Sequence, residues 1–247
     1  MDGCRFKLSG KTAFFKNPEV NTYLYYSYGH IPRVTLLGLL GAILGYKGYN
    51  EEEREGHPEF YKKLDLLPIS IVPNTEDGIY PRKLQTFNNS TGLASNEAGG
   101  NLIVKQVWLE DVSWDIYFKL ENQTALELAN RLKNHKATYI PYLGTNDHMA
   151  TISDVKEISL IKGTTFSVLD SLFLKEDFIT QIDVDTFRYE EYLPFALEEN
   201  TERYKTKKFV YTNELIKKEG KNSNQVYYDK ELNRHLVFYT GEGIYEN

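Results

Sequence analysis

Apolar and polar residues in the first two-thirds of the chain follow the periods of strands and helices in turn. Residues 4–10 alternate between the two before a glycine, which predicts an opening strand. From Val34 to Tyr46 the leucines and isoleucine fall at helical spacing, with Pro32 just upstream and Gly45 near the end. This pattern predicts a helix of about three turns that begins after the aromatic loop 13–32.

The following segments continue the alternation of strands and helices. A charged helix is expected over 58–65, strands over 68–73 and 79–87, two alternating runs over 102–121 separated by a turn at 110–113, a helix over 124–135 capped by Thr124, and a strand over 151–162. Residues 88–101 are small, polar and glycine-rich, as in the tip of a long excursion. The order of elements predicts an α+β fold, the ferredoxin-like (RRM) arrangement with a long insertion between its halves.

The pattern changes after about residue 165. Short β-type runs separated by charged turns predict a smaller β-rich subdomain over 166–247, beside a first domain over 1–165. The sequence shows neither an internal repeat nor a sharp linker that would fix this boundary.

Composition narrows the class of protein. The 247 residues are 41% hydrophobic and 26% charged, which indicates a globular chain with a sizeable core. The 19 tyrosines and 13 phenylalanines suit half-buried sheet faces and interfaces. A net charge of −6 argues against simple electrostatic binding of nucleic acid. Acidic residues at 51–55 nevertheless lie apart from basic ones at 81–83 and 203–208, which leaves room for one basic face.

Several kinds of chemistry lack their sequence signals. Cys4 is the single cysteine and no two histidines are spaced as i and i+4, so we expect neither a disulfide nor a metal site. The glycines at 38–48 lack the patterns of phosphate and dinucleotide loops, and no cofactor is expected. No apolar run is long enough to span a bilayer, and we expect a cytoplasmic protein with no membrane partner.

Binding of RNA is the function that the remaining residues favour. Arg33 stands where the glycine-punctuated helix begins, a place suited to an RNA phosphate, although an exposed arginine near a loop is an equal alternative. Tyr80, Arg82 and Lys83 interleave an aromatic ring with cations, as single-strand binders do, and an ordinary strand face explains them as well. Lys105 adds a weaker signal. A metal-independent ribonuclease could use one histidine with a nearby lysine and tyrosine, and His30 and His148 are the histidines best placed for that role.

Three segments together carry a family resemblance: FKLSGKTAFFKNPEV, GHIPRVTLLGLLGAILGY and YIPYLGTNDHMATI. In combination they resemble the fifth Cas protein family of CRISPR systems. That family belongs to the RAMP superfamily and supplies a backbone subunit of the type I interference complex, Cascade. The resemblance covers most of the first 165 residues and is closest to the type I-B branch, whereas the last 80 residues match only loosely.

The resemblance implies a fold, partners and a site. A ferredoxin-like RAMP domain would cap the 5′ handle of the CRISPR RNA (crRNA) and contact the large subunit and the first repeated backbone subunit, with target DNA bound only indirectly. A thumb-like hairpin would project over about residues 77–104. The RNA-binding residues implied by the family motifs and the pattern together are Lys16, His30, Arg33, Tyr80, Arg82, Lys83, Lys105 and Gly144. No catalytic residue is expected.

Two alternatives stay open. One branch of the family, type I-C, cuts precursor crRNA with a Tyr, Lys and His set, so a metal-independent endoribonuclease is the second hypothesis. That set does not map residue by residue onto this chain. A self-contained RRM-like RNA binder outside any complex is the third.

Gly38, Gly41 and Gly45 interrupt the predicted helix and would let it lie close against the sheet or a neighbouring chain.

Overall fold

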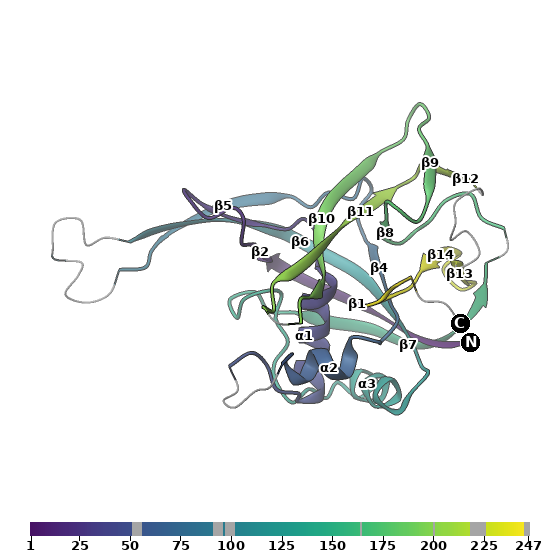
Figure 1. Ribbon diagram of the computed structural model, residues 1–247, viewed down its shortest axis with the longest axis horizontal. Helices are drawn as coiled ribbons and strands as arrows, with labels where there is room; N and C mark the ends of the chain where they lie inside the picture. The colour runs from purple at the N-terminus through teal and green to yellow at the C-terminus, as the bar shows by residue number, and fades with distance from the viewer. Residues whose placement is uncertain are drawn as a thin grey trace.

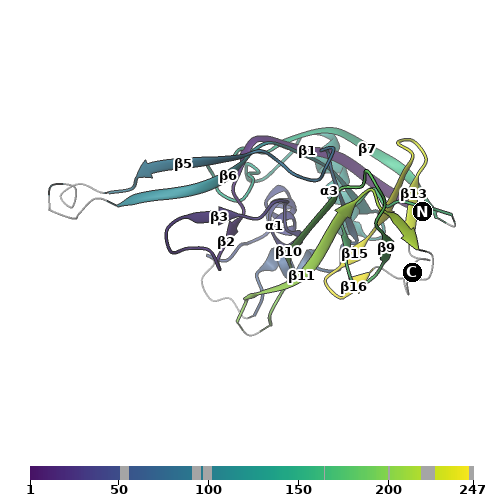
Figure 2. The same cartoon turned by 90° about the horizontal axis from the view of Figure 1, so that it is seen from above.

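The computed structural model describes residues 1–50, 56–90, 96, 102–163, 165–199, 201–217 and 226–244. It has a mixed α+β architecture dominated by one 11-stranded sheet, which confirms the predicted class. Helix α1 (Arg33–Leu44) lies between this sheet and the ribbon formed by β10 (Arg188–Leu197) and β11 (Tyr204–Thr212), as Figures 1 and 2 show. The acidic segment 51–55 lies outside the described residues.

Four strands form the centre of the large sheet. They are β1 (Asp2–Ala13), β4 (Ile69–Pro73), β6 (Ile103–Lys119) and β7 (Thr151–Lys162), in the order β7-β1-β6-β4, with every neighbouring pair antiparallel. Along the chain α1 lies between β1 and β4, and α3 (Gln123–Lys133) lies between β6 and β7. Cys4, Phe6 and Leu8 on β1 are fully buried, so the opening strand runs through the core.

Helix α1 is apolar over most of its surface because most of it is buried, and only Thr35, Gly38 and Ala42 are partly exposed. Leu36, Leu37, Leu39 and Leu40 are each at most 5% exposed. The helix α2 (Glu59–Leu64) packs so close that a Cβ at Gly41 would overlap the Cβ of Phe60. At Gly41 the close approach is therefore made to a second helix and not to the sheet, which corrects the expectation from the sequence.

The helix ends where a residue adopts the left-handed conformation. Gly45 has φ 82°, a value that glycine reaches without a steric cost. The backbone N–H of Tyr46 then bonds to the carbonyl of Gly41 at 2.9 Å. The helix accordingly stops two residues before the predicted end.

Two local predictions are wrong. The turn expected at 110–113 is absent, and β6 runs through it with one irregular residue, Asp111, at φ 50°. The Asp111 carboxylate accepts a hydrogen bond from Lys11 of β1 at 2.7 Å, so the polar residues there belong to a strand surface. Helix α3 is capped by Asn122, whose side chain accepts the N–H of Ala125, and not by Thr124.

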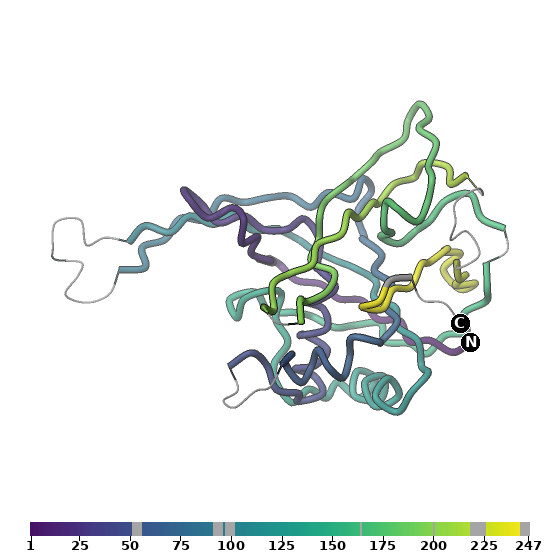
Figure 3. The backbone as a smooth tube through the Cα atoms, viewed as in Figure 1, coloured from purple at the N-terminus to yellow at the C-terminus, as the bar shows by residue number. Residues whose placement is uncertain are grey.

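An extended arm projects from the body. It consists of β5 (Arg82–Asn88) paired with the outer half of β6, and it is supported at its base by β3 (Tyr25–Ser27) and β2 (Lys16–Asn17). Figures 1 and 3 show this arm leaving the compact part of the molecule. It coincides with the excursion predicted over 77–104, of which 91–95 and 97–101 lie outside the described residues.

The chain after residue 165 is β-rich. Its other strands are β8 (Phe173–Leu174), β9 (Ile179–Gln181), β12 (Leu215–Lys217), β13 (Val226–Asp229), β14 (Arg234–Val237), β15 (Tyr239–Thr240) and β16 (Gly243–Ile244). Strand β13 pairs with β7, and β15 pairs with β4. These late strands thus extend the large sheet at both edges, and the boundary at 165 stays a prediction.

Candidate functional site

A groove of about 760 Å³ opens along α1. Four parts of the chain, distant in sequence, meet there: the end of β1, helix α1 with the segment after it, the loop before β7, and the β10–β11 ribbon. We call it the α1 groove, and its lining includes Phe14, Phe15, Lys16, Tyr28, Pro32, Val34, Thr35, Gly38, Tyr46, Lys47, Tyr49, Tyr139, Pro141, Tyr142, Gly144 and Tyr204.

The loop before β7 is tied to the end of β1. The N–H of Phe14 donates to the carbonyl of Leu143 at 3.0 Å, and the N–H of Leu143 donates to the carbonyl of His148 at 2.7 Å. Gly144 has φ 95°, and a Cβ there would overlap the carbonyl oxygen of Phe14. Only glycine fits this position, so Gly144 sets the close approach that forms one wall of the α1 groove.

The start of α1 brings backbone polarity to the α1 groove. Pro32 is its N-cap, and no side chain caps the helix. The first residues, Val34 and Thr35, line the cavity. The N–H groups of a first helical turn point outward and carry the positive end of the helix dipole, which favours an anion.

Several exposed aromatic rings line the α1 groove. Tyr139 is 59% exposed, Tyr142 46%, Tyr49 44% and Tyr204 39%. Burial raises the pKa of Tyr28, deeper in the cavity, to about 12, so its phenol stays neutral near pH 7. Such rings offer flat faces for stacking together with hydroxyl groups that donate hydrogen bonds.

Lysines stand at the rim. Lys16 and Lys47 are exposed and line the α1 groove, and the Lys16 ammonium lies 4.2 Å from the centre of the Tyr25 ring. The arrangement is an aromatic trough with cations at its edge and the first turn of α1 in one wall. It suits a single-stranded, phosphate-bearing chain whose bases can stack.

Of the predicted RNA-binding residues, Lys16 and Gly144 meet in the α1 groove, whereas Arg33 is buried beside it. Arg33 is 4% exposed, donates to the Asp65 carboxylate at 2.9 Å and also bonds to the Asp65 carbonyl. A third bond reaches the carbonyl of Phe195 at 3.3 Å. The guanidinium therefore holds α1 to α2 and β10. The side chain of Arg33 was expected to contact an RNA phosphate, and its role in this structure is instead to join these elements.

His30 and Tyr80 are buried for a similar reason. His30 is fully buried and its Nδ1 accepts the Trp114 indole N–H at 3.1 Å, while burial lowers its pKa to about 3. Tyr80 is 4% exposed and its hydroxyl donates to the carbonyl of Ser113. Neither side chain reaches the surface, so both belong to the core under the arm and not to a surface site.

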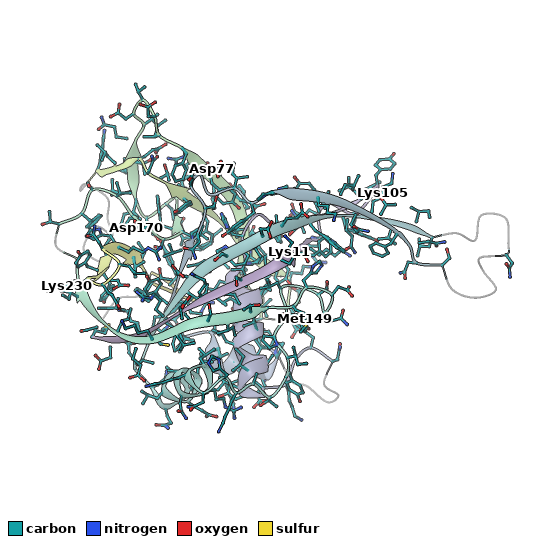
Figure 4. The ribbon with its side chains drawn as sticks, turned by 180° about the vertical axis from the view of Figure 1, so that it is seen from behind. Lys11, Asp77, Lys105, Met149, Asp170 and Lys230 are labelled. Atoms are coloured by element: carbon teal, nitrogen blue, oxygen red, sulfur yellow. The ribbon has the colours of Figure 1, made fainter. Side chains whose placement is uncertain are left out.

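Arg82, Lys83 and Lys105 are exposed on the arm. The Arg82 guanidinium lies 4.5 Å from the centre of the Tyr26 ring and donates to the carbonyl of Ser27 at 3.2 Å. In the ladder Arg82 pairs with Leu109, Lys83 with Trp108 and Lys105 with Thr86, which places Arg82 and Lys105 on one face and Lys83 on the other. Figure 4 shows Lys105 far along the arm from Met149. The predicted residues that reach the surface thus divide between the groove and the arm, whereas Arg33, His30 and Tyr80 are buried.

The histidines considered for catalysis are enclosed. His148 is 1% exposed, its Nδ1 lies 2.7 Å from the Thr12 hydroxyl, and burial lowers its pKa. The Trp108 ring packs nearly perpendicular to the His148 ring, with the two ring centroids 4.6 Å apart. Within the described ranges, no cluster of three or more His, Cys, Asp or Glu side chains is arranged to hold a metal ion. None of the helices in that part of the chain is long and apolar enough to cross a membrane.

A family model described as CRISPR-associated protein (Cas_Cas5), of the Cas5d type, matches residues 3–210. The chain belongs to the Cas5 family. The family resemblance read from the sequence is thereby confirmed. No curated protein matches this Cas5-family chain.

Solved CRISPR structures share the fold of the Cas5-family chain. A chain of a CRISPR RNA-guided surveillance complex is 14% identical with a TM-score of 0.52, covering 87% of this chain and 91% of its own. A CRISPR protein from Archaeoglobus fulgidus is 11% identical, with a TM-score of 0.52 and 97% and 100% coverage. A chain of a Type III-B Cmr-beta complex bound to cognate target RNA and AMPPnP is 10% identical, with a TM-score of 0.54 and 94% and 98% coverage.

Sequence reasoning missed most of the α1 groove. Its exposed tyrosines come from three segments, and only Tyr139 and Tyr142 lie in a motif that the family resemblance used. Tyr204 stands next to the basic run 203–208, which was noted only for its charge. The unusual tyrosine content was the one signal that pointed toward such a surface.

Proposed function

We propose that this Cas5-family chain is a non-catalytic, RNA-binding subunit of a type I CRISPR interference complex in the cytoplasm. It would hold the 5′ handle of crRNA and bridge the repeated backbone subunit and the large subunit, with target DNA bound only indirectly. Family membership supports a CRISPR function, and its structural neighbours occur in RNA-guided complexes. The type I-B branch stays part of the proposal.

The ferredoxin-like RAMP description belongs to the same proposal. Its support is the antiparallel order β7-β1-β6-β4, with α1 connecting β1 to β4 and α3 connecting β6 to β7. This is the order of a β-α-β-β-α-β unit in which the two halves interleave. The arm then corresponds to the thumb-like hairpin expected between the halves.

The α1 groove carries the RNA-binding proposal. Exposed rings of Tyr139, Tyr142 and Tyr49 would stack unpaired bases, Lys16 would neutralise phosphate, and the start of α1 would present N–H groups to the same backbone. These features tolerate any base in the stack, so reading of particular nucleotides would need further contacts. The acidic net charge is compatible because only this surface and the arm would face RNA.

Substitutions in the groove test the RNA-binding proposal. We expect Tyr142→Ala to weaken binding of a labelled 5′-handle RNA, since a stacked ring contributes about 1–3 kcal/mol. For Lys16→Ala the salt dependence of log Kd should become shallower by about 0.7 for one lost phosphate contact on a single strand. Both effects can be followed by fluorescence anisotropy across a salt series.

Lys11→Ala is the matched control. Lys11 is an exposed lysine that pairs with Asp111 at 2.7 Å and does not line the α1 groove. Its removal should leave both affinity and salt slope unchanged. Equal losses in Lys11→Ala and Lys16→Ala, or unchanged binding in Tyr142→Ala, would place the RNA elsewhere.

The non-catalytic assignment has its own support and test. An endoribonuclease using His30 or His148 would need an accessible imidazole that titrates near neutral pH, whereas both rings are buried and burial lowers both pKa values. Labelled repeat RNA incubated with the protein in EDTA should stay intact. A discrete cut that disappears in His148→Ala would replace this assignment with the endoribonuclease hypothesis.

A further inference from the structure

A second projection of the molecule carries exposed aliphatic side chains. It comprises residues 179–186, which are β9 and the turn leading into β10, together with Leu215 of β12, and we call it the apex. Figures 1 and 3 show it rising from the body, away from α2 and α3. Val184 is 84% exposed, Ile182 75%, Ile179 54% and Leu215 45%. Such gathered exposure of branched aliphatics on a protein surface marks an interaction site.

The apex is held in shape by hydrogen bonds at its base. Asn213 accepts the N–H of Phe187 at 2.8 Å through its side-chain oxygen. The Arg188 guanidinium donates to the Thr180 hydroxyl at 2.8 Å and also pairs with Glu214. Ile182 and Val184 are therefore presented by an ordered support, so a partner would meet them with little further loss of chain entropy.

The charged residues of the apex restrict the kind of molecule that it can bind. Asp183 and Asp185 alternate with Ile182 and Val184, and both aspartates are exposed. The cation at the base, Arg188, is also bound to Glu190, at 2.6 Å. Lys217 is exposed and stands directly across from Ile179, so one cation lies at the base of the apex. The tip of the apex, where Asp183 and Asp185 flank Val184, is apolar and acidic, and such a surface repels nucleic-acid phosphates and anionic lipids.

We propose that the apex is a docking surface for another protein, one that presents an apolar socket bordered by lysine or arginine. Ile182 and Val184 would fill the socket, and Asp183 would face the basic border, which sets orientation and the rate of association. This inference rests on the proposed function only in taking the partner to be a subunit of the same complex. It needs no RNA contact.

Binding between purified subunits tests this proposal. The chain would be immobilised without RNA and titrated with the large subunit and with the repeated backbone subunit. We expect Ile182→Ser/Val184→Ser to weaken one of these two interactions at least about tenfold, as for a central apolar contact. Asp183→Lys should slow association of the same subunit. Leu66→Ser, which removes a 61% exposed leucine elsewhere, is the matched control and should change neither interaction.

The outcomes separate this inference from the RNA proposal. Thermal unfolding of each variant shows that the fold is kept, and binding of 5′-handle RNA should be unchanged in the apex variants. The inference is overturned if the parent chain binds neither subunit, or if the double variant binds both as well as the parent does. It is equally overturned if the variants lose affinity for RNA or for phosphatidylserine vesicles while keeping both proteins.

Discussion

Replacing Gly41 by alanine sets two opposing effects against each other. Alanine stabilises a helix interior by about 1 kcal/mol relative to glycine. The added methyl would, however, overlap the Cβ of Phe60 and lie 3.4 Å from its Cγ. These atoms are close to the backbone of α2, so the overlap can be relieved only by moving that helix. Overpacking of this kind costs about 1–3 kcal/mol.

Gly38→Ala isolates the packing effect because the gain in helix propensity is the same. A methyl at position 38 would lie 3.8 Å from the nearest atom, Cε2 of Phe60, which is an ordinary contact. We therefore expect Gly38→Ala to be more stable than the parent and Gly41→Ala to be about 1–3 kcal/mol less stable than Gly38→Ala.

Urea unfolding and thermal melts measure this difference. For a chain of this size each kcal/mol shifts the Tm by about 2–4 °C. Gly41→Ala should consequently melt several degrees below Gly38→Ala, with the same far-ultraviolet circular dichroism. If the two variants melt together, or if Gly41→Ala is the more stable, then α2 does not approach α1 as closely as described.

Two further predictions concern buried cations. Burial lowers the pKa of Lys119 to about 7 from its usual 10.5, so between these pH values the unfolded chain binds more protons than the folded one, and the free energy of unfolding should rise by up to about 1.4 kcal/mol per pH unit. Urea unfolding at pH 7 and pH 9 should show this rise in the parent protein and not in Lys119→Met. An equal change between the two pH values in both proteins would contradict the prediction. Arg33→Ala breaks the buried pair with Asp65 and should lower the free energy of unfolding by about 3–5 kcal/mol, while the folded variant still binds RNA. If the variant instead lost RNA binding at unchanged stability, Arg33 would be an RNA ligand.

The sequence predicted the elements of the first half of the fold well because each has a local cause. The alternation in β1, the leucines of α1 and the amphipathic face of α3 are all visible within a dozen residues. The false turn at 110–113 shows the limit of this reading. Polar residues on the exposed face of a long strand look the same as a turn until the partner strand, with Lys11, is in place.

The candidate site was harder to predict because the burial of a side chain depends on residues that are distant in the sequence. Arg33 has the right charge at the right helix position, but Asp65 and Phe195 enclose it from 32 and 162 residues away. Residue type alone does not tell an enclosed arginine from an exposed one. The same holds for the α1 groove, whose walls come from both ends of the sequence.

The late strands at both margins of the large sheet have a consequence for synthesis on the ribosome. Strand β7 is fully flanked only when β13 has emerged, and β4 only when β15 has done so. Until then, the nascent chain presents two unpaired strand edges, which are the templates on which misassembly begins. Translation that stalls before residue 226 would therefore leave a product prone to aggregate, even though α1 and the central strands are already complete.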